Sequence, residues 1–448
     1  MSTAIVLAGH GSHISPRTAG LVWEHVDGLR ALGLVDEVTA AFWKEAPSFH
    51  QVLRSLTATD VTIVPLFTAQ GYFTQTVIPA EMGLAGPLTI RDGRTIRYTR
   101  TLSEHPYLSQ IVRQRVQGAL QASGAPPGKT AVAIIGHSTR RNPESRRATE
   151  AQARLIRALE PVAEVVDVYL DDSPAIGEVY ALTSAPTLIA VPYFLALGSH
   201  TTQDVPGELG LEPGQTSGQV RGRKVYYTPP VGVEQSLREV IIELARDAGT
   251  PLYEARNEAQ NQAQDGSAWD HCPAAGRDDL IAAVHEAGQM SFGQLLLTPH
   301  EVRRNGHEQP LETLTDPAAL RARVREQPFR PLATSADLPG GWRVPVSDPA
   351  MLHAVVETVY PGAVADWAAH RRGTLLLETL ASTTARQTGM YRALSGYAHS
   401  ADMVARVCGA CVRHPTWYFG HSPAEAIPCA EACNLWMTKA LEAVVQRE

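Results

Sequence analysis

Short apolar runs that end at glycine alternate with segments of helical periodicity over the first half of the chain. Residues 4–8 and 131–135 are two such runs, and a parallel strand buried on both faces is continuously apolar in this way. Ser15-Pro16 and Asn142-Pro143 follow them, each pairing a capping side chain with a proline suited to the first helical position. The pattern predicts βαβ units, in which strands lie parallel and ligands bind at their carboxyl ends.

The helices that follow are expected to turn an apolar stripe toward the sheet. The predicted stripes consist of Ala19, Val22, Trp23 and Val26 in the first helix and Ala151, Leu155, Ala158 and Leu159 in the second. Further buried strands are predicted at residues 60–66 and 187–193.

An internal repeat with an offset of 127 residues relates the two halves of this region. Ala8-Gly9-His10-Gly11-Ser12 recurs as Ile135-Gly136-His137-Ser138-Thr139, and residues 81–84 recur as residues 208–211. One register kept over more than seventy positions indicates a duplication. The fold class expected is therefore α/β, with two tandem doubly wound parallel-sheet units in residues 1–125 and 126–248.

After residue 248 the sequence no longer follows the repeated alternation of strands and helices. Residues 249–275, rich in Asn, Gln and Ala, are predicted to be a linker. Residues 276–346 combine a helical segment with a strand at 294–298 and predict a small α+β domain. Residues 347–448 predict a helical, cysteine-rich domain, and His353 near its start is expected at the surface.

The charge and the apolar content of the chain exclude some classes of partner. The net charge of −7 argues against nucleic acid, which calls for a clustered basic face. The N-terminus lacks the basic leader of a signal peptide, and no stretch approaches the roughly 20 apolar residues that span a bilayer. We therefore expect a cytoplasmic protein with neither a nucleic acid nor a membrane as partner.

Four of the five cysteines lie in the last 41 residues, as Cys408-x-x-Cys411 and Cys429-x-x-x-Cys433. In a large cytoplasmic protein such clustering favours metal ligation over disulfides. The second pair has i, i+4 spacing, which puts both thiolates on one face of a predicted helix. An iron–sulfur cluster, [4Fe–4S], is the preferred interpretation, and structural zinc is the alternative. Cys272 is isolated and is expected to be chemically inert.

The repeat carries a longer motif near its end. The second unit has residues 191–200, Val-Pro-Tyr-Phe-Leu-Ala-Leu-Gly-Ser-His, followed by Asp204-Val205-Pro206. In the first unit, Phe73 stands at the position of His200 and Val77 at that of Asp204. With the Gly-His-Gly-Ser segment, this motif resembles the CbiX-type sirohydrochlorin (class II) chelatases over about residues 1–245. The C-terminal cysteines also resemble cluster domains attached to some chelatases.

The resemblance implies a metal chelatase of cobalamin or siroheme biosynthesis that inserts cobalt, iron or nickel into sirohydrochlorin or a related tetrapyrrole. By the family's pattern, His137 and His200 bind the incoming ion with an acidic residue, for which Asp172 is preferred to Asp171. His10 remains a candidate metal ligand without its partner. Arg140 and Arg141 are candidates for the substrate carboxylates, and an electron donor is a further candidate partner. The alternative is a non-catalytic metal- or tetrapyrrole-binding redox protein.

Overall fold

The structure is a computed structural model, and it describes residues 2–12, 16–138, 143–198, 200–254, 268–305, 311–323 and 340–375, with Trp436, Lys439, Leu441 and Glu442 near the C-terminus. Arg140, Arg141 and the four C-terminal cysteines lie outside these residues. Within the described residues, no helix has the length and apolar character needed to cross a membrane.

The first unit is a five-stranded sheet in the order β2-β1-β3-β5-β4, parallel except for β4. Its strands are β1 (Thr3–Gly9), β2 (Glu37–Phe42), β3 (Asp60–Pro65), β4 (Leu88–Arg91) and β5 (Arg94–Tyr98). Its helical elements are α1 (Pro16–Leu32), α2 (Val52–Ser55), the π-helical turn η1 (Phe73–Val77), α3 (Ile78–Met82), η2 (Leu102–Glu104) and α4 (Pro106–Ser123).

The second unit repeats this topology, with strand order β7-β6-β8-β10-β9. Its strands are β6 (Thr130–Gly136), β7 (Glu164–Tyr169), β8 (Thr187–Pro192), β9 (Ser217–Val220) and β10 (Arg223–Tyr227). Its helical elements are η3 (Pro127–Lys129), α5 (Pro143–Leu159), η4 (Ile176–Glu178), α6 (Val179–Leu182), the π-helical turn η5 (His200–Asp204), α7 (Val205–Glu208), η6 (Val231–Val233) and α8 (Leu237–Asp247). The prediction of two tandem doubly wound units is confirmed.

The apolar stripe predicted for α1 is buried, but the stripe predicted for α5 is wrong. Leu159 is 48% exposed, and Ala151 and Ala158 are exposed as well. The face of α5 that packs on the sheet carries Thr149, Gln152, Ala153 and Ile156. Ala153 stands 127 positions after Val26, so the duplicated packing register, rather than the local hydrophobicity of α5, decides which face is buried.

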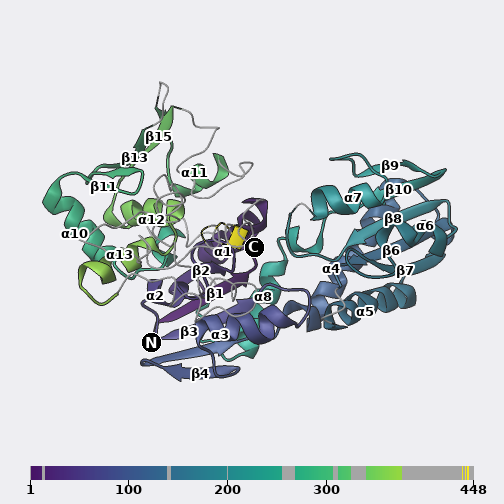
Figure 1. Cartoon of the computed structure of the whole chain (residues 1–448), viewed down its shortest axis with the longest axis horizontal. Helices are drawn as coiled ribbons and strands as arrows, with labels where there is room; N and C mark the ends of the chain where they lie inside the picture. The colour runs from purple at the N-terminus through teal and green to yellow at the C-terminus, as the bar shows by residue number, and fades with distance from the viewer. Residues whose placement is uncertain are drawn as a thin grey trace.

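The last helix of each unit packs against the other unit. Helix α4 follows β5 in the chain but contacts β8 and α5 of the second unit, and α8 contacts β3 and α1 of the first (Figure 1). The hydroxyls of Thr62 on β3 and Thr250 after α8 lie 2.6 Å apart. Side chains from both sheets and both exchanged helices form one hydrophobic cluster, so the two units are held together by a shared core.

A third domain contains a five-stranded sheet in the order β11-β12-β13-β15-β14, in which only β14 and β15 pair in parallel. Its elements are η7 (Ala268–His271), α10 (Arg277–Ala287), β11 (Met290–Phe292), β12 (Leu295–Leu297), β13 (Glu301–Asn305), β14 (Glu312–Thr313), α11 (Pro317–Arg323), β15 (Gly341–Pro345), α12 (Pro349–Val359) and α13 (Ala363–Arg371). Helices α12 and α13 pack into the same core as the sheet, although we expected a separate helical domain from residue 347.

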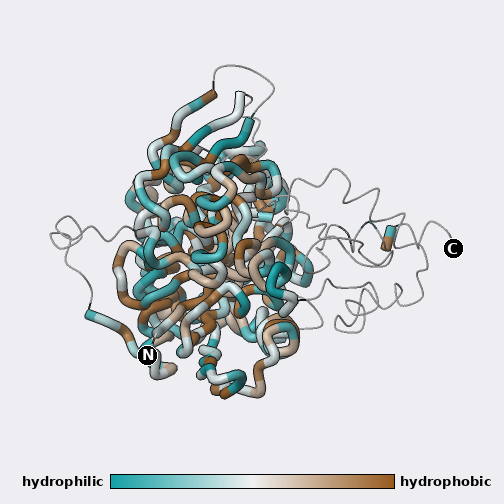
Figure 2. Tube along the Cα trace, turned by 90° about the vertical axis from the view of Figure 1, so that its left-hand side faces the viewer, coloured by the Kyte–Doolittle hydropathy of each residue, from teal (hydrophilic) through white to brown (hydrophobic). Residues whose placement is uncertain are grey.

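The third domain docks on the first unit, where α13 contacts α2. The buried carboxylate of Asp366 accepts hydrogen bonds from Arg54 Nε at 2.8 Å and from Gln51 Nε2 at 2.7 Å. Figure 2 shows hydrophobic stretches running through the middle of the molecule, with hydrophilic segments among the outer turns.

Candidate functional site

Two neighbouring strands of the second sheet bring His137 and His200 together. His137 follows β6 directly, and His200 opens η5 after β8, which pairs in parallel with β6. The two imidazole rings lie edge to face, with centroids 5.8 Å apart and planes at 85°. The structure thus unites the two histidines that the sequence motif singled out, at the carboxyl edge of a parallel sheet, where ligands of such sheets bind.

Asp204 orients the ring of His200. Its Oδ2 lies 2.7 Å from Nδ1 of His200, four residues earlier in η5. An ionised carboxylate only accepts hydrogen bonds, so Nδ1 carries the hydrogen and Nε2 of the neutral ring keeps its lone pair. Sequence reasoning placed Asp204 in the motif without giving it a task, although its i, i+4 spacing from His200 was the signal available.

His137 lies beside Asp171, whose Oδ2 is 3.4 Å from its Nε2. Burial lowers the pKa of His137 below its ordinary value of 6.5, and the neighbouring charge of His200 lowers it further. The carboxylate of Asp171 and a backbone hydrogen bond to Ser138 act in the opposite direction. Because the net effect is downward, His137 is neutral near pH 7 and can donate a lone pair to a metal ion.

Asp171 is therefore the carboxylate that lies beside His137, whereas Asp172, which we expected there, is hydrogen-bonded to other groups. Oδ2 of Asp172 accepts hydrogen bonds from Ser138 Oγ at 3.0 Å and from Arg146 Nη1 at 3.1 Å. A third hydrogen bond, from the Ser173 N–H, reaches its Oδ1 at 2.9 Å. These hydrogen bonds, that of Ser173 first, hold the pKa of Asp172 below its usual value.

Asp172 supports the loop that carries His137. Ser138 has a φ of 35°, in the left-handed region that the equivalent Gly11 occupies with a φ of 67°. A non-glycine residue is strained there, and the hydrogen bond from Ser138 to Asp172 stabilises this conformation. The change from Gly-His-Gly to Gly-His-Ser thus leaves the position of His137 intact.

His10 occupies the corresponding position in the first unit. Its Nδ1 lies 2.9 Å from the carbonyl of Gly11, and its ring faces Phe73 at a centroid distance of 4.9 Å. Burial lowers the pKa of His10, and so, more weakly, do the positive charges of Lys44, His137 and His200. The second unit lies close to this loop, because the Thr18 hydroxyl on α1 donates a hydrogen bond to the carbonyl of Leu197 at 3.3 Å.

Glu208, the last residue of α7, is a further acidic side chain near this site that sequence reasoning missed. Glu208 is the third member of the series His200, Asp204, Glu208, at intervals of four residues. Burial raises its pKa, and the negative charges of Asp204 and Asp171 raise it further. Among the described residues, no three His, Cys, Asp or Glu side chains already surround a common ion position, so the site presents its donors without forming a closed cage.

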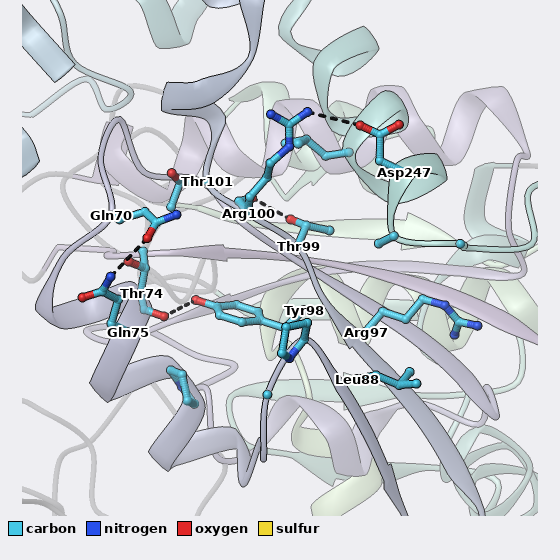
Figure 3. A pocket seen from close by; sticks show the side chains of 16 residues that line it. Gln70, Thr74, Gln75, Leu88, Arg97, Tyr98, Thr99, Arg100, Thr101 and Asp247 are labelled. Atoms are coloured by element: carbon cyan, nitrogen blue, oxygen red, sulfur yellow. Dashed lines mark hydrogen bonds and ion pairs between the residues drawn. The ribbon is translucent and has the colours of Figure 1, made fainter.

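A cavity of about 780 Å³ lies elsewhere in the first unit, lined by η1, β5, α8 and the loops beside them (Figure 3). Thr74 of η1 accepts a hydrogen bond at its carbonyl from the Tyr98 hydroxyl, at 2.7 Å. The two arginines of the lining are paired, Arg97 with Asp60 and Arg100 with Asp247. The described residues that line this cavity include no histidine, which distinguishes it from the site around His137 and His200.

The predicted residues Arg140, Arg141, Cys408, Cys411, Cys429 and Cys433 lie outside the described residues, so their roles stay predictions.

Residues 4–119 and 131–248 match the CbiX family model. Residues 277–371 match the DR2241 stabilising domain, and residues 372–442 match a 4Fe-4S iron-sulfur cluster binding domain.

Individual relatives agree with these matches. The chain is 33% identical over 289 residues to a probable sirohydrochlorin cobaltochelatase of Halobacterium salinarum, which covers 59% of this chain and 98% of that protein. A sirohydrochlorin cobaltochelatase of Methanopyrus kandleri is 27% identical over 139 residues, covering 26% of this chain and 96% of its own. The crystal structure of DR2241 from Deinococcus radiodurans covers 100% of both chains, with a TM-score of 0.74 and 27% identity. That protein is described as multi-domain, with structural similarity to chelatases and two additional novel domains.

Proposed function

Because the chain belongs to the CbiX family, whose model matches both of its α/β units, we propose that it is a cytoplasmic chelatase that inserts a divalent metal ion into sirohydrochlorin or a related tetrapyrrole. The observation that carries this proposal is the pair of facing imidazoles, His137 and His200, in the second unit. Neutral imidazoles suit cobalt, nickel, iron and zinc ions. Cobalt is the first ion to test, because the relatives are described as cobaltochelatases.

In this proposal the metal ion is a substrate, held by His137, His200 and Asp171. We assign the carboxylate to Asp171 because it lies 3.4 Å from His137 Nε2, whereas Asp172 is occupied by Ser138 and Arg146. Two imidazoles and one carboxylate leave coordination positions open for the nitrogens of the macrocycle. A site that is not closed around the ion also favours its release into the product.

Insertion exchanges two pyrrole N–H protons for one divalent ion, so the site must accept protons as well as deliver metal. Glu208, whose pKa is raised by burial and by neighbouring carboxylates, is our candidate for this task, because a raised pKa makes a carboxylate a stronger proton acceptor. Asp204 keeps His200 in one orientation throughout. The candidate clamps for the substrate carboxylates remain Arg140 and Arg141.

We further propose that Cys408, Cys411, Cys429 and Cys433 bind a [4Fe–4S] cluster. Support comes from the match of residues 372–442 to a 4Fe-4S cluster-binding domain, and four thiolates are the donor set that such a cluster requires. When bound, the cluster would supply one-electron redox chemistry, with an electron donor as a further partner.

The chelatase proposal is tested by incubating anaerobically purified protein with sirohydrochlorin and Co²⁺ and following the absorption change on metal insertion. His137→Ala and His200→Ala should each reduce the rate by at least about 100-fold, since each removes a metal ligand. His285→Ala, at an exposed histidine on α10, is the matched control and should retain the wild-type rate. Wild-type protein that metallates sirohydrochlorin no faster than buffer would disprove the chelatase and favour a non-catalytic binding protein.

The cluster is tested separately. Anaerobically purified protein should be brown, with a broad visible absorption that dithionite bleaches, and should contain four iron and four sulfide per chain by the stoichiometry of [4Fe–4S]. Cys429→Ser should lose this absorption, while Cys272→Ser, at a buried cysteine of the third domain, should keep it. Colourless protein with stoichiometric zinc would contradict the proposal.

A further inference from the structure

At the positions of Asp171 and His200 the first unit carries side chains of different chemistry, although His10 matches His137 and Glu81 matches Glu208. Lys44 is the counterpart of Asp171, 127 positions apart. The backbone confirms this equivalence, because Lys44 N–H donates to the carbonyl of His10 at 3.0 Å, and Asp171 N–H donates to that of His137 at 3.3 Å. A carboxylate beside the histidine in one unit is thus an ammonium group in the other.

Phe73 replaces His200 with the same ring arrangement. Its ring stands edge to face against His10, with centroids 4.9 Å apart and planes at 78°. The corresponding values for His137 and His200 are 5.8 Å and 85°. The first unit has therefore kept the shape of the metal site while exchanging a nitrogen donor for an apolar ring.

Phe73 is the centre of an aromatic group that we call the aromatic platform, made of Trp43, Phe67, Tyr72 and Phe73. The rings of Trp43 and Phe67 lie 6.0 Å from that of Phe73, and the ring of Tyr72 lies 6.1 Å from it. Tyr72 is 56% exposed, and the other three are partly exposed. An apolar surface of this kind normally signals an interaction.

The platform adjoins the metal site of the second unit. Phe73 contacts His10, and on α1, which follows the His10 loop, the Thr18 hydroxyl donates a hydrogen bond at 3.3 Å to the carbonyl of Leu197, three residues before His200. Lys44 lies beside His10 too, since its backbone N–H donates to the carbonyl of His10. Within the described residues Lys44 forms no ion pair, so its ammonium group is available to a ligand.

We propose that the aromatic platform and Lys44 bind the tetrapyrrole, whose conjugated ring packs on the platform while a peripheral carboxylate pairs with Lys44. This inference rests on the proposed function and adds the substrate-binding half of the site. Aromatic side chains bind flat conjugated rings through stacking or edge contacts, and an ammonium–carboxylate pair is a charge-assisted hydrogen bond. The second unit then presents the metal ion to the bound macrocycle.

The proposal is tested by titrating the full-length protein with metal-free sirohydrochlorin and measuring its fluorescence, which gives a dissociation constant without turnover. Lys44→Ala and Phe73→Ala should each raise this constant about tenfold, as expected for loss of one charge-assisted or aromatic contact. Lys44→Glu should raise it further, and Lys44→Arg should stay close to wild type. The KM for Co²⁺ should change little in all four variants, because none removes a metal ligand.

Lys129→Ala is the matched control, since Lys129 is an exposed lysine just before β6, at the opposite edge of the sheet from His137. Added salt should weaken binding less in Lys44→Ala than in the wild type, because screening then acts on one charge pair fewer. Wild-type metallation with unchanged tetrapyrrole binding in Lys44→Glu and Phe73→Ala would overturn this inference alone. A wild type that neither binds nor metallates sirohydrochlorin would instead disprove the proposed function.

Discussion

Nδ1 of His200 donates a hydrogen bond to Oδ2 of Asp204 at 2.7 Å, within the single π-helical turn η5. This bond fixes the ring and leaves Nε2 for the metal ion. Carboxylates that orient a ligating histidine typically contribute 10- to 100-fold in metal affinity or activity, by the order-of-magnitude rule for such supporting groups.

Asp204→Ala should therefore reduce cobalt insertion by roughly 10- to 100-fold, because His200 loses its orientation but not its nitrogen donor. The measurement is kcat/KM for Co²⁺ at saturating tetrapyrrole. Glu212→Ala, at an exposed carboxylate beyond α7, is the control and should behave as the wild type. Equal rates for Asp204→Ala and the wild type would mean that this hydrogen bond plays no part in presenting His200.

Asp171 and Asp172 should differ in role: Asp171 as a ligand of the metal ion, and Asp172 as a support for the loop that carries His137. Asp171→Ala should reduce insertion more than about tenfold at an unchanged melting temperature, because Asp171 makes no side-chain hydrogen bond in the described structure that the fold depends on. Asp172→Ala should lower the melting temperature, because Ser138 and Arg146 lose their acceptor. Calorimetry and insertion rates on both variants check this, and the reverse pattern would restore Asp172 as the metal ligand.

The rate of metal insertion should fall at acid pH as His137 becomes protonated, which gives the acid limb of the pH–rate profile. Its pKa is lowered by burial from the ordinary 6.5, so its neutral, metal-binding form persists below pH 6.5, and the fall in rate that belongs to His137 should lie at a lower pH. Asp171 raises this pKa; removing its charge in Asp171→Asn should shift the acid limb to still lower pH, at a reduced maximal rate. Rates measured between about pH 5 and 8 test the shift. An acid limb that moves upward in Asp171→Asn would contradict this assignment.

His353 should make folding sensitive to acid. The side chain is completely buried on α12, and burial lowers its pKa to about 3. Between that value and 6.5, the unfolded chain binds a proton that the folded chain does not, so stability is lost as the pH falls below about 6.5. Relative to His353→Leu, the wild type should lose about 2 kcal/mol of unfolding free energy from pH 7 to pH 5.

Glu357, one turn along α12, acts with the opposite sign. Burial raises its pKa to about 7, so the folded chain holds a proton that the unfolded chain releases above about 4.5, and its contribution to stability falls as the pH rises. Glu357 is present in both the wild type and His353→Leu, so its effect on stability cancels when the two proteins are compared. Urea unfolding at the two pH values makes the comparison, and parallel changes in the two proteins would show that His353 is not buried neutral.

Local signals in the sequence predicted most of what carries the candidate chemistry. Apolar runs gave the strands that end at His10 and His137, and the offset of 127 residues gave two equivalent units. The same offset identified Phe73 as the replacement for His200, which the ring arrangement at His10 confirms. These features depend on short stretches of chain or on a comparison of the chain with itself, so they could be inferred without coordinates.

Other features required contacts between distant segments. Both Asp171 and Asp172 follow β7, and only the tertiary structure shows that Asp171 lies beside His137 while Asp172 accepts hydrogen bonds from Ser138 and Arg146. His353, which we expected at the surface, is completely buried on α12, which the sheet and the other helices of the third domain cover. Charged or polar residue type predicts exposure only on average, and tertiary packing overrides it.

The sequence by itself determined the duplicated α/β units, the histidine pair and the cysteine set, because periodicity, motif spacing and internal repetition are properties of the chain alone. Only the tertiary structure decided that α4 and α8 exchange between the units and that α1 of the first unit meets the loop before His200. Each exchanged helix has an apolar face that either sheet could cover, so its amphipathic pattern does not specify a partner. The choice depends on how the two units pack into one core, which no local pattern encodes.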